Sequence, residues 1–165
     1  IPATSSMFIA HKKFVLGIDR KAKVKISYVG DNFTEWFLSS KGKIEDPIGK
    51  QKLAYAKLKK SSVDTPIITE LGGEANAETT LTEVYGCMAK QPNGEEGALL
   101  TNGWANIFYV RDQNNVLRAV AVYWRGDGWH VGAYSVEVPR AWRGGPRAFS
   151  RNSVLNPSAT VSAQV

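Results

Sequence analysis

The sequence predicts an α+β fold, in which one or two helices pack on one face of an antiparallel sheet. Three strand-like segments follow one another in the C-terminal half, and the turns between them are too short for a crossover. One strongly amphipathic helical segment precedes them. With 43% hydrophobic and 22% charged residues, the 165-residue chain can build an ordinary core. We expect a single domain over residues 1–152 and a loose, small and uncharged tail over residues 153–165.

The C-terminal strands are rich in β-branched and aromatic residues, which favour extended structure. They span Ala105–Arg111, Val116–Arg125 and Trp129–Val138, and Gly126-Asp127-Gly128 is a strong turn signal between the last two. The sequence therefore predicts a three-stranded meander. Arg147–Ser150 is a candidate for one further short strand.

The clearest helix is predicted over Leu81–Lys90. Thr80 and Glu83 have the spacing of a capping box, in which each side chain satisfies a backbone N–H of the other. Gly86 lowers the stability of such a helix by about 1 kcal/mol relative to alanine. Either another part of the chain approaches Gly86 closely, or packing compensates. One face of this helix carries the apolar residues Leu81, Val84, Tyr85 and Met88.

The N-terminal half gives weaker local signals. Lys13–Ile18 and Lys23–Val29 are predicted as strands, the second because its apolar and polar residues alternate. Asn32 and Glu35 have the spacing of a helix cap and its reciprocal partner, which predicts a short helix over Phe33–Ser39. Such a helix is too short to be stable alone, so its aromatic side chains must dock on the sheet.

The middle of the chain leaves one segment open. Lys41–Lys60 fits a strand or a helix equally well. Val63–Leu71 is predicted as a strand, and Pro66 within it favours an edge position or a bend.

Cysteine and hydropathy patterns favour a protein of the cytoplasm. Cys87 is the only cysteine, so no intramolecular disulfide can form and an oxidising compartment is not indicated. No apolar run approaches the roughly 20 residues that a membrane-spanning helix needs, so no membrane partner is expected. The oligomeric state is left open.

The sequence predicts no catalytic residue, no metal and no cofactor, although it does not decide whether the protein is an enzyme. His11, His130 and Cys87 lack the spacing of metal ligands. Glycine-rich fingerprints for phosphate or dinucleotide binding are absent. The carboxylate pairs Glu45-Asp46 and Glu95-Glu96 lie in polar loops, where they are expected to be solvated, and Cys87 is expected to be a small core residue.

The basic residues carry the main functional hypothesis. Lysine and arginine number 21 against 15 aspartate and glutamate, which leaves a net charge of +6. They gather in three clusters, each with few acids nearby. The first comprises Lys12, Lys13, Arg20, Lys21, Lys23 and Lys25. The second comprises Lys50, Lys52, Lys57, Lys59 and Lys60.

The third basic cluster lies in Pro139–Arg151 and interleaves arginines with aromatic residues. Arginine binds phosphate in a bidentate manner and aromatic planes stack on bases, so this composition suits single-stranded nucleic acid, another anionic partner or a protein. Solvated strand faces and an aromatic residue folded over the sheet edge would explain the same pattern. The predicted contact residues are Arg140, Trp142, Arg143, Arg147 and Arg151.

A pocket on the sheet is the alternative. Small residues in the meander lie among aromatic ones, an arrangement that can shape a cavity for a small molecule. His130 and Tyr134 would be its polar groups, in a ligand-binding protein or an enzyme. The two hypotheses differ in what they require: convergence of the basic clusters for one, and a cavity against the meander for the other.

Part of the C-terminal half resembles a known group of proteins. The runs Asn102–Asp112, Gly126–Trp129 and Phe149–Asn152 are similar to those of small uncharacterised proteins from uncultivated bacteria. The resemblance covers Thr80–Ser153 and rests on turn and core residues. It implies a shared compact domain, and it implies no activity and no site residue.

Overall fold

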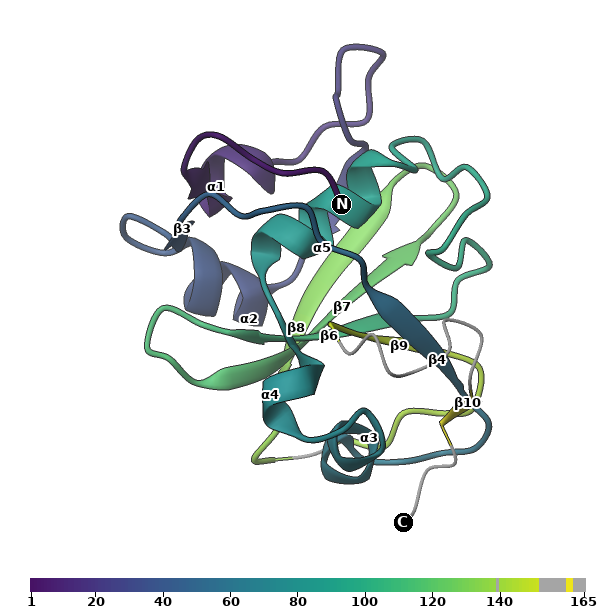
Figure 1. Ribbon diagram of the computed structural model, residues 1–165. Coiled ribbons are helices and arrows are strands. Elements are labelled where there is room, and N and C mark those ends of the chain that lie inside the picture. The colour runs from purple at the N-terminus through teal and green to yellow at the C-terminus, as the bar shows by residue number, and fades with distance from the viewer. Residues whose placement is uncertain (139, 152–159, 162–165) are drawn as a thin grey trace.

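The computed structural model, which describes residues 1–138, 140–151 and 160–161, has the predicted α+β architecture (Figure 1). Its main sheet is mostly antiparallel. In spatial order its strands are β10 (Thr160–Val161), β4 (Ala54–Leu58), β9 (Arg147–Ser150), β6 (Asn106–Arg111), β7 (Leu117–Trp124), β8 (Trp129–Ser135) and β2 (Ile26–Val29), with β5 (Glu78–Thr79) also paired to β6. A separate two-stranded sheet joins β1 (Phe8–Ile9) and β3 (Ile44–Glu45).

The predicted meander is confirmed as β6, β7 and β8. Ile107 of β6 lies opposite Ala121 of β7, which lies opposite Gly132 of β8, all in antiparallel register. The short strand predicted at Arg147–Ser150 is also confirmed, as β9. Most of the predicted tail lies outside the described residues; Thr160 and Val161 pair with β4 in parallel.

The helices connect and cover these strands. They are α1 (Ala10–Lys13), α2 (Asp31–Phe33), which continues into the π-helical turn η1 (Thr34–Leu38), α3 (Asp64–Glu70), α4 (Glu74–Ala77) and α5 (Leu81–Ala89). The capping box of α5 is confirmed, since Thr80 N donates to Glu83 Oε1 at 2.9 Å and Glu83 N donates to Thr80 Oγ1 at 3.2 Å. Within the described residues, no helix combines the length and apolar character needed to cross a membrane.

Two hydrophobic clusters lie on opposite faces of the sheet because side chains alternate along each strand. On the first face, Phe108 and Phe149 pack with Leu81 of α5 and with the aromatic residues of α2 and η1. On the second face, Tyr109 and Ala119 pack with α3 and α4. The sheet therefore carries helices on the second face as well as on the face that the sequence predicts to be covered.

The strand predicted at Val63–Leu71 is wrong, because this segment forms α3. Pro66 lies in the first helical turn, where the missing N–H costs no internal hydrogen bond. Ile67 and Leu71 are then one turn apart, and both are buried against the second face. Pro66, which in a strand favours an edge position or a bend, is also compatible with the start of a helix.

Two further N-terminal predictions are wrong in detail. Lys13–Ile18 forms no strand; α1 ends at Lys13 and Gly17 makes a single bridge to Ile26. The short helix is present, but Gly30 and not Asn32 precedes its first residue. The Asn32 side chain instead donates to the carbonyl of Ala133 at 3.2 Å, which ties the helix start to β8.

Candidate functional site

A row of three aromatic rings crosses β2, β8 and β7 on the second face. His130 lies opposite Tyr123 in the antiparallel pair and beside Tyr28 in the parallel pair. The His130 ring centroid is 5.2 Å from that of Tyr28 and 5.5 Å from that of Tyr123. Tyr28 is 49% exposed. Because the buried residues of α3 and α4 pack mainly on β4, β9 and β6, this row stays accessible.

The rings border a hollow of about 280 Å³, close to the lower end of the usual range for ligand pockets. Ala121 and Gly132 lie on the same face of the sheet, and their small side chains leave room between the rings. The hollow is lined by Tyr28, Gly30, Asp31, Asn32, Tyr123, Gly132, Ala133 and Tyr134. Of the two residues predicted for a pocket on the sheet, Tyr134 lines this hollow and His130 does not.

Two arginines lie over these rings. The Arg125 guanidinium is 4.7 Å from the Tyr123 ring centroid, and the Arg140 guanidinium is 5.3 Å from that of Tyr134. Both residues are exposed, so each holds a cation against an aromatic surface at the edge of the hollow. We call this set the ring surface: Tyr28, Tyr123, Arg125, His130, Tyr134 and Arg140.

The ring surface shifts the ionisation of its own members. Burial, and then the nearby Arg125, lower the pKa of His130, while Asp127 opposes the shift. The imidazole is therefore neutral at neutral pH and presents an uncharged ring. Burial and the neighbouring Tyr123 raise the pKa of Tyr134, so its hydroxyl stays protonated and able to donate a hydrogen bond.

Acceptors at the rim complete the hollow. Asp31 is its one lining carboxylate, and Asn32 uses its amide N–H₂ on Ala133, which leaves the amide oxygen directed elsewhere. Such oxygens accept hydrogen bonds from amino groups. Stacking rings, cations and acceptors together match three features of a nucleotide: a flat base, a phosphate and the N–H groups of the base.

Of the predicted arginine cluster, Arg140 belongs to the ring surface and Trp142 lies beside it. Trp142 packs edge-on against Tyr134, with ring centroids 5.4 Å apart, and its Nε1 donates to Asp64 Oδ1 at 2.8 Å. Trp142 is half-buried, so it anchors this segment to α3. A smaller hollow of about 70 Å³ shares Tyr134 and is lined by Tyr134, Arg140, Ala141 and Trp142.

The other predicted contact residues lie elsewhere. Arg147 lies over the Tyr55 ring at 4.4 Å and donates to the carbonyl of Ala98 at 2.6 Å. Arg151 pairs with Glu83 of α5. Arg143 is exposed, and Pro139 lies outside the described residues. The structure therefore divides the predicted cluster between two faces of the sheet.

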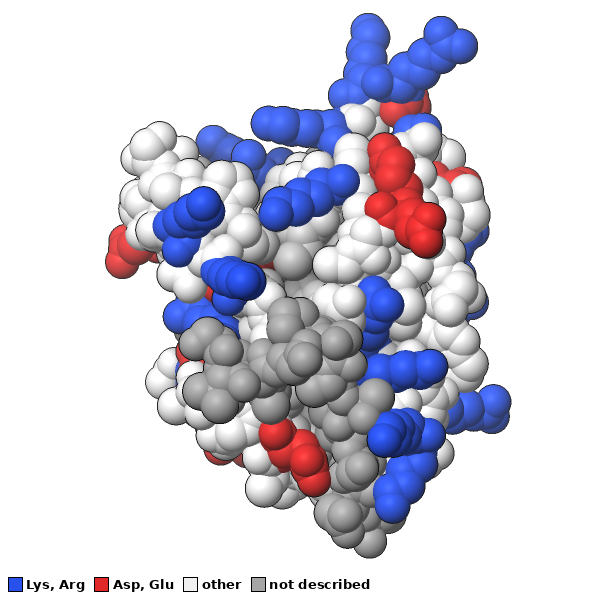
Figure 2. Space-filling model, turned by 45° about the vertical axis from the view of Figure 1, so that its right-hand side comes forward, with Lys and Arg blue, Asp and Glu red and all other residues white. Residues whose placement is uncertain are grey.

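The basic clusters converge only in part. Because β4 pairs with β9, Lys57 lies opposite Arg147, which brings the second and third clusters together along one edge. The first cluster lies near α5 and the following loop, where Lys13 lies over the Tyr85 ring and Lys25 Nζ donates to Asn93. Figure 2 shows lysine and arginine side chains distributed across one side of the molecule, with acidic groups between them.

Nucleophile and metal chemistry find little support in the described part of the chain. Burial raises the pKa of the Cys87 thiol to about 12, so the reactive thiolate is not populated at neutral pH. No three His, Cys, Asp or Glu side chains gather among the described residues in a way that could hold a metal ion.

The comparisons with known proteins found no matching family model, no matching curated protein and no matching solved structure.

Proposed function

We propose that this protein is a non-enzymatic binding module that holds single-stranded nucleic acid across its ring surface. The observation that carries the proposal is the row of Tyr28, His130 and Tyr123, with centroid spacings of 5.2 and 5.5 Å and cations on neighbouring rings. Aromatic side chains on an open sheet are stacking surfaces for unpaired bases. In this proposal, Arg125 and Arg140 contact the phosphates that link the stacked bases.

A strand bound in this way lies along the row from β2 toward β7. Bases stack on Tyr28 and Tyr123, and Asp31 accepts a hydrogen bond from a base N–H group. This arrangement recognises bases by stacking and phosphates by charge, so it predicts little sequence preference. The proposal also gives a function to the exposed aromatic side chain of Tyr28, since a polar side chain at this position would serve stability equally well.

The test is the binding of a fluorescently labelled oligouridine of about twelve nucleotides, followed by anisotropy. Tyr28→Ala should weaken binding by roughly 5- to 150-fold, the worth of about 1–3 kcal/mol of one stacked base. Tyr28→Phe keeps the ring and should bind like the wild type. Trp104→Ala removes an exposed aromatic residue outside the ring surface and is the matched control.

Salt dependence tests the arginines. Each phosphate contact to a single strand contributes a slope of roughly 0.7 in log affinity against log salt. With two such contacts, affinity should fall about sevenfold between about 50 and 200 mM salt, and Arg125→Gln or Arg140→Gln should each reduce the slope by about half. Arg20→Gln, in an exposed loop, should leave the slope unchanged.

Two results would overturn the proposal: no binding at low salt, or equal losses in Tyr28→Ala and Trp104→Ala. If uridine monophosphate competes as effectively as the oligonucleotide, the hollow is a small-molecule site instead. That outcome favours the second candidate, which the 280 Å³ volume of the hollow supports independently.

A further inference from the structure

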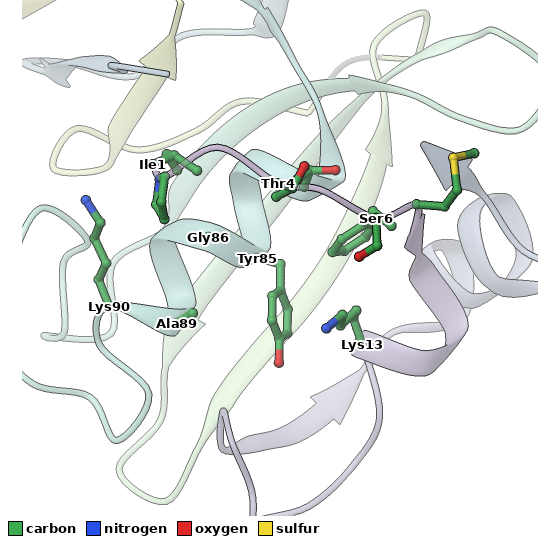
Figure 3. Close-up of a pocket in the computed structure, with 12 residues that line it drawn as sticks. Ile1, Thr4, Ser6, Lys13, Tyr85, Gly86, Ala89 and Lys90 are labelled. Carbon is green, nitrogen blue, oxygen red and sulfur yellow. The ribbon is translucent and has the colours of Figure 1, made fainter. Parts of the chain in front are cut away.

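A second cavity, remote from the ring surface, lies between the N-terminal segment and α5. It has a volume of about 320 Å³, and residues 1–8 form one wall while α5 forms the other (Figure 3). Lys13 of α1 closes one end, and Lys90 lies at the other. We call this cavity the α5 groove.

The outer wall of the groove is held in place by hydrogen bonds to the chain before β4. Thr4 N donates to the carbonyl of Ile48 at 2.8 Å, and Ile48 N donates to Thr4 Oγ1 at the same distance. Gln51 N donates to the carbonyl of Ile1 at 2.9 Å. The wall is therefore fixed to a second segment and does not depend on a ligand to form.

Gly86 explains how the wall approaches the helix. A Cβ placed at this position would lie 2.8 Å from Cγ2 of Ile1, closer than real contacts of this kind. The glycine that weakens α5 thus allows close approach of the N-terminal segment. This answers the question raised by the sequence, where Gly86 required either a close neighbour or compensating packing.

The lining of the groove carries positive charge and no negative charge. Its charged side chains are both cations, Lys13 and Lys90, and the lining includes no carboxylate; the ammonium of Ile1, which also lines the cavity, donates to the carbonyl of Gln51 at 2.7 Å. None of the ion pairs found among the described residues includes either lysine. Figure 3 places the Lys13 ammonium and the Ser6 hydroxyl toward the same space beside the Tyr85 ring. The rest of the surface is mainly apolar: Ile1, Pro2, Met7, Phe8, Gly86 and Ala89.

We propose that the α5 groove binds a medium-chain carboxylate. The carboxylate accepts hydrogen bonds from Lys13 Nζ and Ser6 Oγ, and the alkyl chain lies along Tyr85 toward Ala89. An apolar body matches the lining, and an anionic head matches an end that has a cation and a hydroxyl donor but no acid. A neutral or cationic amphiphile would leave Lys13 without a counter-charge.

The direct test is a titration of the protein with hexanoate, octanoate and decanoate, followed by the amide NMR signals of Ser6, Gly86 and Ala89. Because each buried methylene strengthens binding by up to about fourfold, affinity should rise along the series until the groove is filled. Decanol, with the same chain but no charge, should bind at least roughly tenfold more weakly than decanoate.

Variants locate the head and the chain. Lys13→Gln should weaken decanoate binding by roughly tenfold. Lys12→Gln, its exposed neighbour in α1 that does not line the groove, should bind like the wild type. Ala89→Trp fills the groove from an exposed helix position and should abolish binding while the circular dichroism spectrum stays unchanged.

The proposal fails if decanoate causes no saturable shift, if decanol binds as tightly as decanoate, or if Lys12→Gln and Lys13→Gln lose affinity equally. It also fails if Ala89→Trp binds normally. Oligouridine binding is expected to be unaffected by Lys13→Gln, so the failure of either proposal can be recognised without the other.

Discussion

The guanidinium of Arg151 donates to both carboxylate oxygens of Glu83, with its shortest contact at 2.7 Å. Glu83 is fully buried in the first turn of α5, where it also accepts from Thr80 N and Thr80 Oγ1. Arg151 follows β9 directly. One ion pair therefore joins the helix cap to the end of a central strand, and Arg151, which the sequence predicts as a partner contact, makes this structural contact.

We expect Arg151→Ala to lower the free energy of unfolding by about 2 kcal/mol. This is below the roughly 3–5 kcal/mol for breaking a fully buried pair, because the Arg151 side chain is 37% exposed. Arg143→Ala, at an exposed position nearby, should change stability by less than about 0.5 kcal/mol. Urea unfolding of both variants is the measurement. Equal stability of the two would show that Arg151 is free to bind a ligand.

The buried carboxyl group of Asp64 should make the stability of the fold depend on pH in an unusual direction. Burial raises the pKa of its carboxyl group, while hydrogen bonds from Trp142 and Tyr109 oppose the shift. The folded state then holds the proton more tightly than the unfolded state. The contribution of Asp64 to the free energy of unfolding is therefore fully present below pH 3.8 and is lost as pH rises through the pKa of the folded state. The Asp64→Asn variant should therefore become more stable relative to the wild type as pH rises through this range.

Asp112 is the internal comparison for that experiment. Burial would raise its pKa, but hydrogen bonds from Arg118 and from the backbone of Val116 and Asn114 lower it overall. The contribution of Asp112 to the free energy of unfolding is present above pH 3.8 and is lost as pH falls through the pKa of the folded state. Urea unfolding at several pH values should give opposite trends for Asp64→Asn and Asp112→Asn. Parallel trends would contradict the assignment.

The backbone of Gly94 packs closely against the ring of Trp124. It has φ of +72°, and a Cβ at this position would lie 2.2 Å from the Trp124 ring. Gly94→Ala should cost about 3 kcal/mol or more, from backbone strain together with overpacking. Gly103→Ala tests the strain alone, because φ is +89° and nothing lies within 4 Å of the added carbon. It should cost only about 1 kcal/mol, measured by thermal unfolding.

Protonation of His130 should strengthen nucleic-acid binding. Its pKa is lowered from 6.5, chiefly by burial, so the added positive charge appears only at more acidic pH. Oligouridine affinity should rise as pH falls from 6.5 toward 5, because a phosphate favours the protonated ring. His130→Gln should remove this rise and His11→Gln should keep it. An identical pH profile in His130→Gln would contradict the placement of the ligand on the ring surface.

The C-terminal half of the fold was predictable because its signals are local. Gly126-Asp127-Gly128 sets the turn between β7 and β8, and a two-residue alternation then places His130 and Tyr134 on one face. The shared face of His130 and Tyr134 could be predicted for this reason. Tyr28 could not, because its parallel pairing with His130 joins segments far apart in the sequence without a turn to set the register.

The strand predicted at Val63–Leu71 was wrong for a similar reason. An isoleucine-rich segment with one proline fits a strand edge or a helix start, and only packing on Tyr109 and Ala119 selects the helix over Asp64–Glu70. An arginine that follows a strand has the same local sequence whether it contacts solvent, a ligand or Glu83. Arg151 contacts Glu83 because of where β9 lies relative to α5 in the fold.

The place of β9 in the sheet also governs when the fold can form. Arg147–Ser150 follows the meander in the sequence, yet it lies between β4 and β6 near the middle of the sheet. During synthesis, β4 and the meander therefore have no shared strand until residues 147–150 have left the ribosome. Non-local pairings of this kind slow folding. We infer that truncation before Arg147 leaves β4 without either of its neighbours in the described sheet, β9 and β10, while β6, β7, β8 and β2 keep their pairings with one another.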